Sequence, residues 1–147
     1  MKKAEKKAIT LANLTKIYNE LPELAKKNPK IRQEFDMDLY GVYCGLKANI
    51  IKTECKTHGC GLGNSARLFD VQKSDFSDKE FSYDKFGKRI LPYLYMDYGQ
   101  NVWAFLFSAS WSQCQPTFKQ FIKRLKYAID MDLELGDWNY KKSNFVK

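Results

Sequence analysis

The chain of 147 residues has little histidine and little arginine, and it lacks a long apolar run. Its only histidine is His58, and its four arginines leave lysine to carry most of the positive charge. No apolar segment approaches the roughly 20 residues of a membrane-spanning helix, which excludes such a helix. The basic start is not followed by an apolar region or a small-residue cleavage site. We therefore expect no secretory signal and a cytoplasmic location.

Apolar and aromatic residues, in contrast, are plentiful. They make up 44% and 15% of the chain, enough to build a sizeable core, so a disordered chain is excluded. The length suits one domain, and neither an internal repeat nor a low-complexity linker is visible. The sequence predicts one compact, mainly α-helical domain over residues 1–147, with a basic tail from about residue 137.

The formal net charge is +8. The excess of basic residues lies in residues 1–34 and 116–147, whereas residues 35–115 are neutral. Such an excess attracts polyanions weakly and over long range. Lysine is a point charge without the bidentate geometry of arginine. The charge therefore fits a solvated lysine-rich surface, and the alternative is weak nucleic-acid binding by the lysine faces of the first and last helices.

Apolar spacing predicts a first helix from Ala4 to about Leu21. Pro22 is expected to end this helix or to begin a new one, and Asn28-Pro29 to break the chain direction. A mostly buried helix is predicted over residues 39–51. The apolar stripe of the first helix consists of Ala8, Leu11, Leu14, Tyr18 and Leu21.

The middle of the chain is expected to contain shorter elements. A short helix is predicted over residues 64–69. Ser77, with Glu80 as its return partner, is expected to cap another helix that ends at Gly87. Residues 90–98 are ambiguous between a short β-hairpin and an irregular buried segment.

Two helices are predicted in the last third. Residues 102–111 are apolar on nearly every side, which is typical of a central buried helix, so Trp103 and Trp111 are expected to be largely buried. A closing helix is expected to begin at Gln115-Pro116-Thr117 and to stop before Gly136. Its solvent side is predicted to carry Lys119, Lys123 and Lys126, with Arg124 at the edge.

Two motifs stand out in this order of elements. The first is Cys55-x-Thr57-x-x-Cys60-x-x-Gly63, and the second is Trp103-x-Phe105-Leu106-Phe107-Ser108-x-x-Trp111. Together they resemble a family of small tailed-phage and prophage proteins, over roughly residues 8 to 130. The resemblance implies a phage accessory protein in the bacterial cytoplasm and assigns no chemistry. Proteins of this kind often bind a host factor or a defence component.

The glycine-rich stretch from Cys55 to Gly63 is the first candidate site. Three glycines in five positions before a helix allow backbone N–H groups to cradle an anion, although neither a P-loop nor a dinucleotide motif is present. The alternative is a tight structural loop. The polar groups expected to face a ligand are Thr57, His58, Ser65 and Arg67.

Cysteine chemistry offers two further alternatives. Cys55, His58 and Cys60 are weak metal-ligand candidates, because their spacing matches no familiar zinc site. Cys60, with His58 as its base, is a candidate nucleophile of a small hydrolase. We favour reduced, structural thiols and expect no metal and no cofactor.

The tyrosines after Pro92 form the second candidate site. Tyr93, Tyr95 and Tyr98 are expected to be exposed, and aromatic residues on a surface loop suit a partner interface. The favoured interpretation is a non-enzymatic protein that binds a host macromolecule or a signalling ligand. The sequence predicts no oligomeric state.

Overall fold

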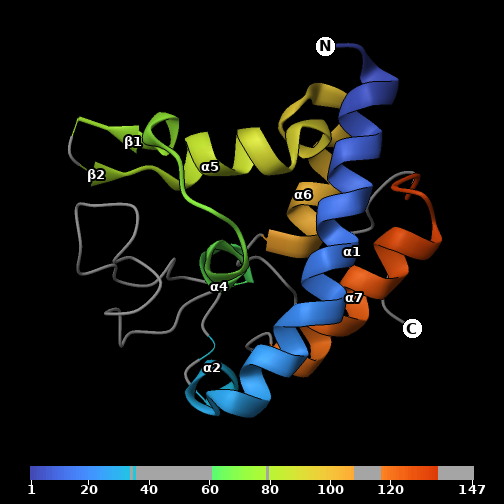
Figure 1. Cartoon of the computed structure of the whole chain (residues 1–147). Coiled ribbons are helices and arrows are strands. Elements are labelled where there is room, and N and C mark those ends of the chain that lie inside the picture. Colours follow the sequence, from blue (N-terminus) through green and yellow to red (C-terminus); the bar gives the residue numbers. More distant parts are fainter. Residues whose placement is uncertain (34, 36–60, 79, 108–116, 136–147) are drawn as a thin grey trace.

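The computed structural model describes residues 1–33, 35, 61–78, 80–107 and 117–135, and this part of the chain is mainly helical, as predicted (Figure 1). None of the described helices is both long and apolar enough to cross a lipid bilayer. The predicted helix over residues 39–51, Trp111 and the basic tail lie outside the described residues. The elements are α1 (Lys3–Lys27), α2 (Lys30–Gln33), α4 (Gly61–Ser65), η1 (Ala66–Leu68), η2 (Lys73–Asp75), β1 (Phe76–Ser77), β2 (Glu80–Phe81), α5 (Tyr83–Ile90), η3 (Pro92–Tyr95), η4 (Asp97–Gly99), α6 (Gln100–Phe107) and α7 (Phe118–Asp130), where η marks a 3-10 helix.

The apolar stripe of α1 is confirmed in its central part, where Leu14, Ile17 and Leu21 are fully buried. The expectation that the helix ends or restarts at Pro22 is wrong, because α1 continues through this residue to Lys27. A proline inside a helix removes one backbone hydrogen bond. Continuing the helix buries Ala25 in the core, and this packing offsets the loss.

A small hairpin precedes α5. Strand β1 pairs antiparallel with β2, so that Phe76 lies opposite Phe81. Ser77 belongs to β1 and does not cap a helix, which corrects the prediction. The capping residue is Ser82, whose Oγ accepts a hydrogen bond from the backbone N–H of Lys85 at 3.2 Å. The helix then passes through Gly87 to Ile90 rather than ending there.

The ambiguous segment 90–98 contains no strand. It forms the two 3-10 helices η3 and η4, and the chain enters α6 directly from them. The short helix predicted over residues 64–69 begins earlier, at Gly61, and continues as the 3-10 helix η1. The start of this helix was not predicted because it contains two glycines, and glycine has a low helix propensity.

Helix α7 begins after Thr117, whose side chain exchanges capping hydrogen bonds with Gln120. The predicted outward lysines are exposed. Arg124 is not at the edge, however, since only 4% of its surface is exposed. Its Nη1 donates to the carbonyl oxygen of Phe105 at 2.8 Å. This hydrogen bond joins α7 to the last turn of α6.

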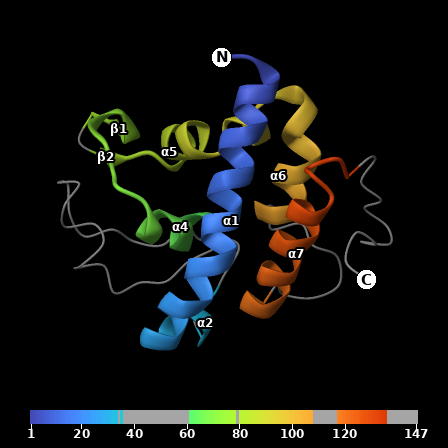
Figure 2. The same cartoon turned by 45° about the vertical axis from the view of Figure 1, so that its right-hand side comes forward.

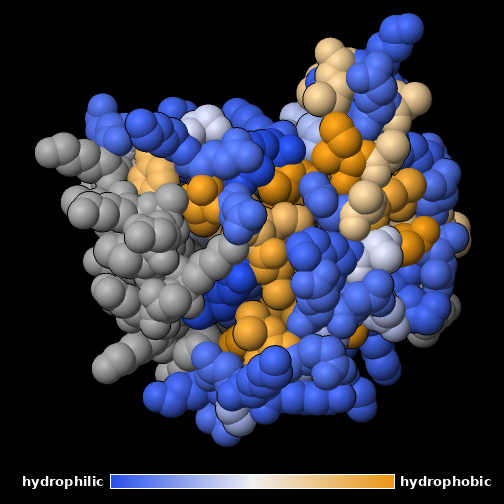
Figure 3. All heavy atoms as spheres, viewed as in Figure 1, coloured by the Kyte–Doolittle hydropathy of each residue, from blue (hydrophilic) through white to orange (hydrophobic). Residues whose placement is uncertain are grey.

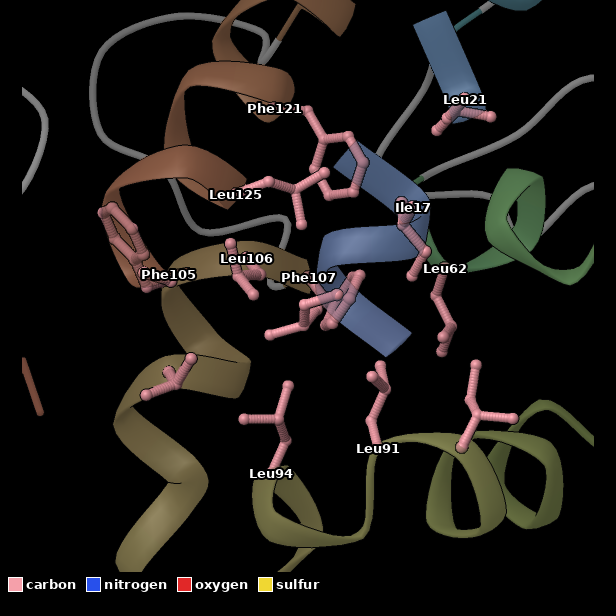
Figure 4. Packing of buried hydrophobic residues seen from close by; sticks show 14 of the residues in the cluster. Ile17, Leu21, Leu62, Leu91, Leu94, Phe105, Leu106, Phe107, Phe121 and Leu125 are labelled. Carbon is pink, nitrogen blue, oxygen red and sulfur yellow. The ribbon is translucent and has the colours of Figure 1, made fainter. Parts of the chain in front are cut away.

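The buried apolar side chains form one cluster between the helices. Helix α1 packs on η3 and on α7, and α7 also contacts α6 (Figures 1 and 2). Side chains from all of these elements point toward one another in the core (Figure 4). The core therefore joins segments that lie far apart in the sequence.

An ion pair ties the start of α1 to the turn after α7. Lys7 Nζ lies 3.0 Å from Glu134 Oε1 and 3.1 Å from Asp132 Oδ2. The hydrogen bond to Glu134, more than any other contact, raises the pKa of Lys7 above its ordinary value of 10.5. A cation whose pKa is raised by folding stabilises the fold below that ordinary value, and the stabilisation is lost as pH rises through the folded-state pKa.

We therefore expect Lys7→Gln to lower the free energy of unfolding at pH 7 by at most about 1 kcal/mol, because both carboxylates are exposed. The difference from the unmodified protein should shrink as pH rises beyond 10.5. Urea unfolding at pH 7 and above pH 10.5 measures it, with the exposed Lys2→Gln as the control. A difference that persists unchanged at high pH would contradict this role of the pair.

Candidate functional site

A cavity of about 350 Å³ opens between η3 and α6. This volume lies at the lower end of the range for binding sites of small ligands, about 300–1,000 Å³. Apolar and aromatic side chains provide most of the wall, and two amide side chains provide the polar part. The lining residues are Leu94, Tyr95, Gln100, Asn101, Trp103 and Ala104.

Helix α6 presents one side to the core and another to this cavity. Gln100, Trp103 and Ala104 are three and four positions apart, so they share one face of the helix. Val102 and Phe105 are buried in the core. The predicted buried helix over residues 102–111 is described as far as Phe107, and one of its faces borders a cavity rather than other core residues.

The ring of Tyr95 is held between two helices. A Cβ atom at Gly87 of α5 would clash with the Tyr95 hydroxyl and lie only 2.8 Å from Cε1, so only glycine lets the ring lie this close. On the other side, the ring centres of Tyr95 and Trp103 are 6.5 Å apart in an edge-to-face arrangement. These contacts fix the aromatic wall of the cavity.

Trp103 packs against the core, as predicted, but is partly rather than fully buried. The physical reason is its place between the core, where it meets Phe107 at 6.3 Å between ring centres, and the cavity. Its indole Nε1 is buried and has no hydrogen-bond acceptor within the part of the chain that the structure describes. An unpaired buried donor costs about 1–3 kcal/mol.

Exposed apolar side chains occur in the same stretch of sequence as the residues that line the cavity. Met96 and Tyr98 are each 37% exposed, among the few large apolar residues on the described surface. Lysines of α1 reach both: Lys6 Nζ lies 3.2 Å from Met96 Sδ, and Lys3 Nζ lies 4.7 Å from the Tyr98 ring centre. Cavity and exposed residues together form what we call the 94–104 surface.

The structure separates the three predicted tyrosines. Tyr98 is exposed and Tyr95 is half-buried, but Tyr93 is buried, so its predicted exposure is wrong. Its backbone N–H donates to Thr10 Oγ1 at 3.0 Å, which fixes η3 against α1. Burial raises the pKa of the Tyr93 phenol, and the carboxylate of Glu134 adds to this effect. Tyr93 is thus a neutral core residue near neutral pH.

The glycine-rich candidate site is described only in its second half. Thr57, His58, Cys55 and Cys60 lie outside the described residues. Ser65 is fully buried, and so it does not reach the surface at which a ligand was expected.

Arg67, the remaining member of that predicted site, is half-buried and donates from Nε to Asn64 Oδ1 at 3.2 Å. The described residues contain no group of three side chains suited to bind a metal ion. The structure thus places Ser65 in the core and Arg67 half-exposed on the neighbouring turn of the same segment.

Sequence reasoning identified Tyr95 and Tyr98 but missed Met96, Gln100 and Ala104. The helical spacing of Gln100, Trp103 and Ala104 was the available signal, since it places an amide and a small side chain beside a tryptophan on one face. Comparisons of the chain with models of protein families, with curated proteins and with solved structures found no match.

Proposed function

We propose that this chain is a non-enzymatic phage accessory protein, acting in the bacterial cytoplasm, that binds a host protein through the 94–104 surface. The resemblance of its two motifs to small phage proteins supports the class. The single observation that carries the proposal is the cavity of about 350 Å³ walled by Tyr95 and Trp103, in a segment that also carries two exposed apolar side chains.

The lining of the cavity suits one apolar side chain of a partner. Tightly bound interfaces are anchored by a few side chains inserted into pockets that exclude water. Leu94, Tyr95 and Trp103 offer apolar contact, while the amides of Gln100 and Asn101 offer donors and acceptors for a partner's backbone. The expected partner segment therefore carries a large apolar residue in an accessible stretch of chain.

The surroundings of the cavity add two further features of an interface. Methionine and tyrosine are enriched at interfaces, and Met96 and Tyr98 supply exposed examples. Lys3 and Lys6 lie against these two residues and make the edge positive. Acidic residues flanking the inserted side chain would therefore speed association.

Filling the cavity tests the proposal without removing a core side chain. Ala104→Leu adds bulk at the cavity wall, and we expect it to weaken partner binding at least tenfold. Ala12→Leu makes the same change at an exposed position of α1 and is the matched control. The measurement is affinity capture from a bacterial lysate at 0.5 M salt, which suppresses contacts of the lysines alone, followed by mass spectrometry and titration of the captured protein.

The expected result is a host protein retained by the unmodified chain and by Ala12→Leu, and lost with Ala104→Leu at equal thermal stability. Retention of the same proteins by both variants would refute the cavity as the binding site. Retention by Ala104→Leu together with loss in a Met96→Ser, Tyr98→Ser variant would place binding on the exposed rim alone.

A further inference from the structure

A second surface of different chemistry lies far from the cavity. The residues of the 94–104 surface contact the first half of α1, as the bonds of Lys6 and Thr10 show. The other end of this helix, 25 residues and about 37 Å long, meets α2 and the start of α7. We infer that this end of the molecule binds the phosphate backbone of duplex nucleic acid. Its cations, called here the basic end, are Lys27, Lys30, Arg32, Lys119 and Lys123.

Three elements bring these cations together. Lys27 ends α1, Lys30 and Arg32 belong to α2, and α2 contacts α7. The guanidinium carbon of Arg32 lies 4.8 Å from the ring centre of Phe118, the first residue of α7. The ends of all three helices lie together at the bottom of Figure 1, and the lower edge of the space-filling view is mostly hydrophilic (Figure 3).

The basic end keeps its charge because its cations have no acidic partners within the described residues. All five are exposed, and none of them makes an ion pair there. The first turn of α7 contains no acidic residue. Several cations elsewhere are instead neutralised in ion pairs, which are Lys7 with Asp132 and Glu134, Lys16 with Glu20, Lys26 with Glu23, Lys88 with Asp84, Arg89 with Asp75, and Lys126 with Asp130.

This pairing divides the lysine face of α7. Lys119, Lys123 and Lys126 share one side of the helix, but Lys126 lies 2.6 Å from Asp130. The first two lysines therefore extend the unpaired charge from the basic end one turn along α7, and the charge stops there. The lysine face predicted for α7 is thus reduced to the half of the helix that belongs to the basic end.

The absence of apolar groups distinguishes nucleic acid from other polyanionic partners. The large apolar residues exposed in the described part of the chain are Met1, Met96, Tyr98 and Met131, and none belongs to the basic end. A membrane-surface helix needs apolar side chains to insert, and a protein interface needs apolar anchors. Phosphate contact needs neither, and lysine serves it as a point charge.

The same composition predicts how the nucleic acid is bound. Single strands are held by stacking on exposed aromatic rings, and the basic end has none to offer, because Phe118 is buried beneath Arg32. Base-edge recognition relies mainly on bidentate arginine, asparagine or glutamine, whereas four of the five cations are lysines. The expected ligand is therefore a duplex, bound with little dependence on its sequence.

The test is titration of a 20-base-pair DNA duplex of mixed sequence at several salt concentrations. Contact with up to five phosphates predicts that log K falls with log salt at a slope between about −3 and −5. Lys119→Gln combined with Lys123→Gln should reduce the steepness by about 2 and weaken binding roughly tenfold or more near 0.1 M salt. Lys73→Gln combined with Lys88→Gln removes the same charge at exposed positions elsewhere and should leave the slope unchanged.

All four lysines are exposed, so equal melting temperatures are expected and show that folding is intact. Ala104→Leu should bind the duplex normally, which separates this site from the proposed protein-binding surface. A slope shallower than about −1, or equal loss in the Lys73, Lys88 control, would overturn the inference. So would tighter binding to polyglutamate or to anionic lipid vesicles than to the duplex.

Discussion

Phe121→Ala should lower the free energy of unfolding by about 3–5 kcal/mol, the range for deleting a buried phenyl ring from a core. Phe121 is fully buried in the first turn of α7. Its ring centre lies 5.6 Å from that of Phe35 and 5.9 Å from that of Phe107, so the ring joins α7 to α6 and to the residues after α2. Removing it leaves a cavity at the meeting point of three segments.

Urea unfolding measures the effect, since domains of this size are typically stable by about 5–15 kcal/mol and the variant should retain some cooperative folding. Phe121→Leu keeps much of the volume and should cost clearly less. Ile122→Ala, at a partly buried neighbour in the same helix, is a second comparison. A loss below about 1 kcal/mol for Phe121→Ala would mean that this ring is not central to the core.

Asp75→Ala is the second substitution with a large expected effect, again about 3–5 kcal/mol. Asp75 is fully buried. Its Oδ1 and Oδ2 accept from Arg89 Nε and Nη2 at 2.9 and 2.8 Å, and Oδ2 also accepts from the backbone N–H of Gln72 at 2.9 Å. Removing Asp75 leaves the Arg89 guanidinium, which is only 27% exposed, without its carboxylate and leaves the backbone N–H of Gln72 without this acceptor, which costs more than the pair itself contributes.

The loss should appear in urea unfolding, and a double-mutant cycle with Arg89→Met should show strong coupling between the two residues. Lys88→Ala breaks the exposed pair with Asp84 in the same helix and should cost no more than about 0.5 kcal/mol. Similar losses for Asp75→Ala and Lys88→Ala would show that burial does not set the strength of the Asp75–Arg89 pair.

The sequence predicted the fold best where apolar spacing was regular and uninterrupted. The stripe of α1 and the capped start of α7 at Thr117 follow local rules, and both are found in the structure. The helix was wrongly predicted to end or restart at Pro22, because the local rule considers only the backbone hydrogen bond that proline removes. Ala25 lies beyond Pro22 in the same helix, and its burial depends on contacts with segments that are distant in the sequence.

Ser77 and Ser82 show a second limit. Both precede residues that can form a first helical turn, and the sequence rule favoured Ser77 because Glu80 follows at the right distance. The structure uses residues 76–81 for a hairpin, with Asp78 in the left-handed region at φ 56°, and moves the cap to Ser82. Pairing between Phe76 and Phe81 decided between two locally acceptable choices.

Only part of the candidate site was predicted from the sequence. Tyr95 and Tyr98 were predicted, with Tyr93, to be surface aromatics, whereas Trp103 was predicted as a largely buried core residue and not as part of a site. What places Tyr95 beside Trp103 is the close approach of its ring to Gly87, a contact that no helical or strand periodicity encodes. Likewise, the basic end depends on which lysines find acidic partners, and that depends on the tertiary structure.

The packing of α1 also determines when the protein can fold during its synthesis. The partners of this first helix are made much later: Thr10 bonds to Tyr93, 83 residues on, and Lys7 to Glu134, 127 residues on. At about 5–20 residues per second, α1 waits on the order of ten seconds for the segments that cover its apolar stripe. Contacts of such long sequence separation also slow folding itself. A ribosome that stalls before residue 118 therefore holds a chain whose first helix has no α7 to pack against, and that chain is open to aggregation and to proteases.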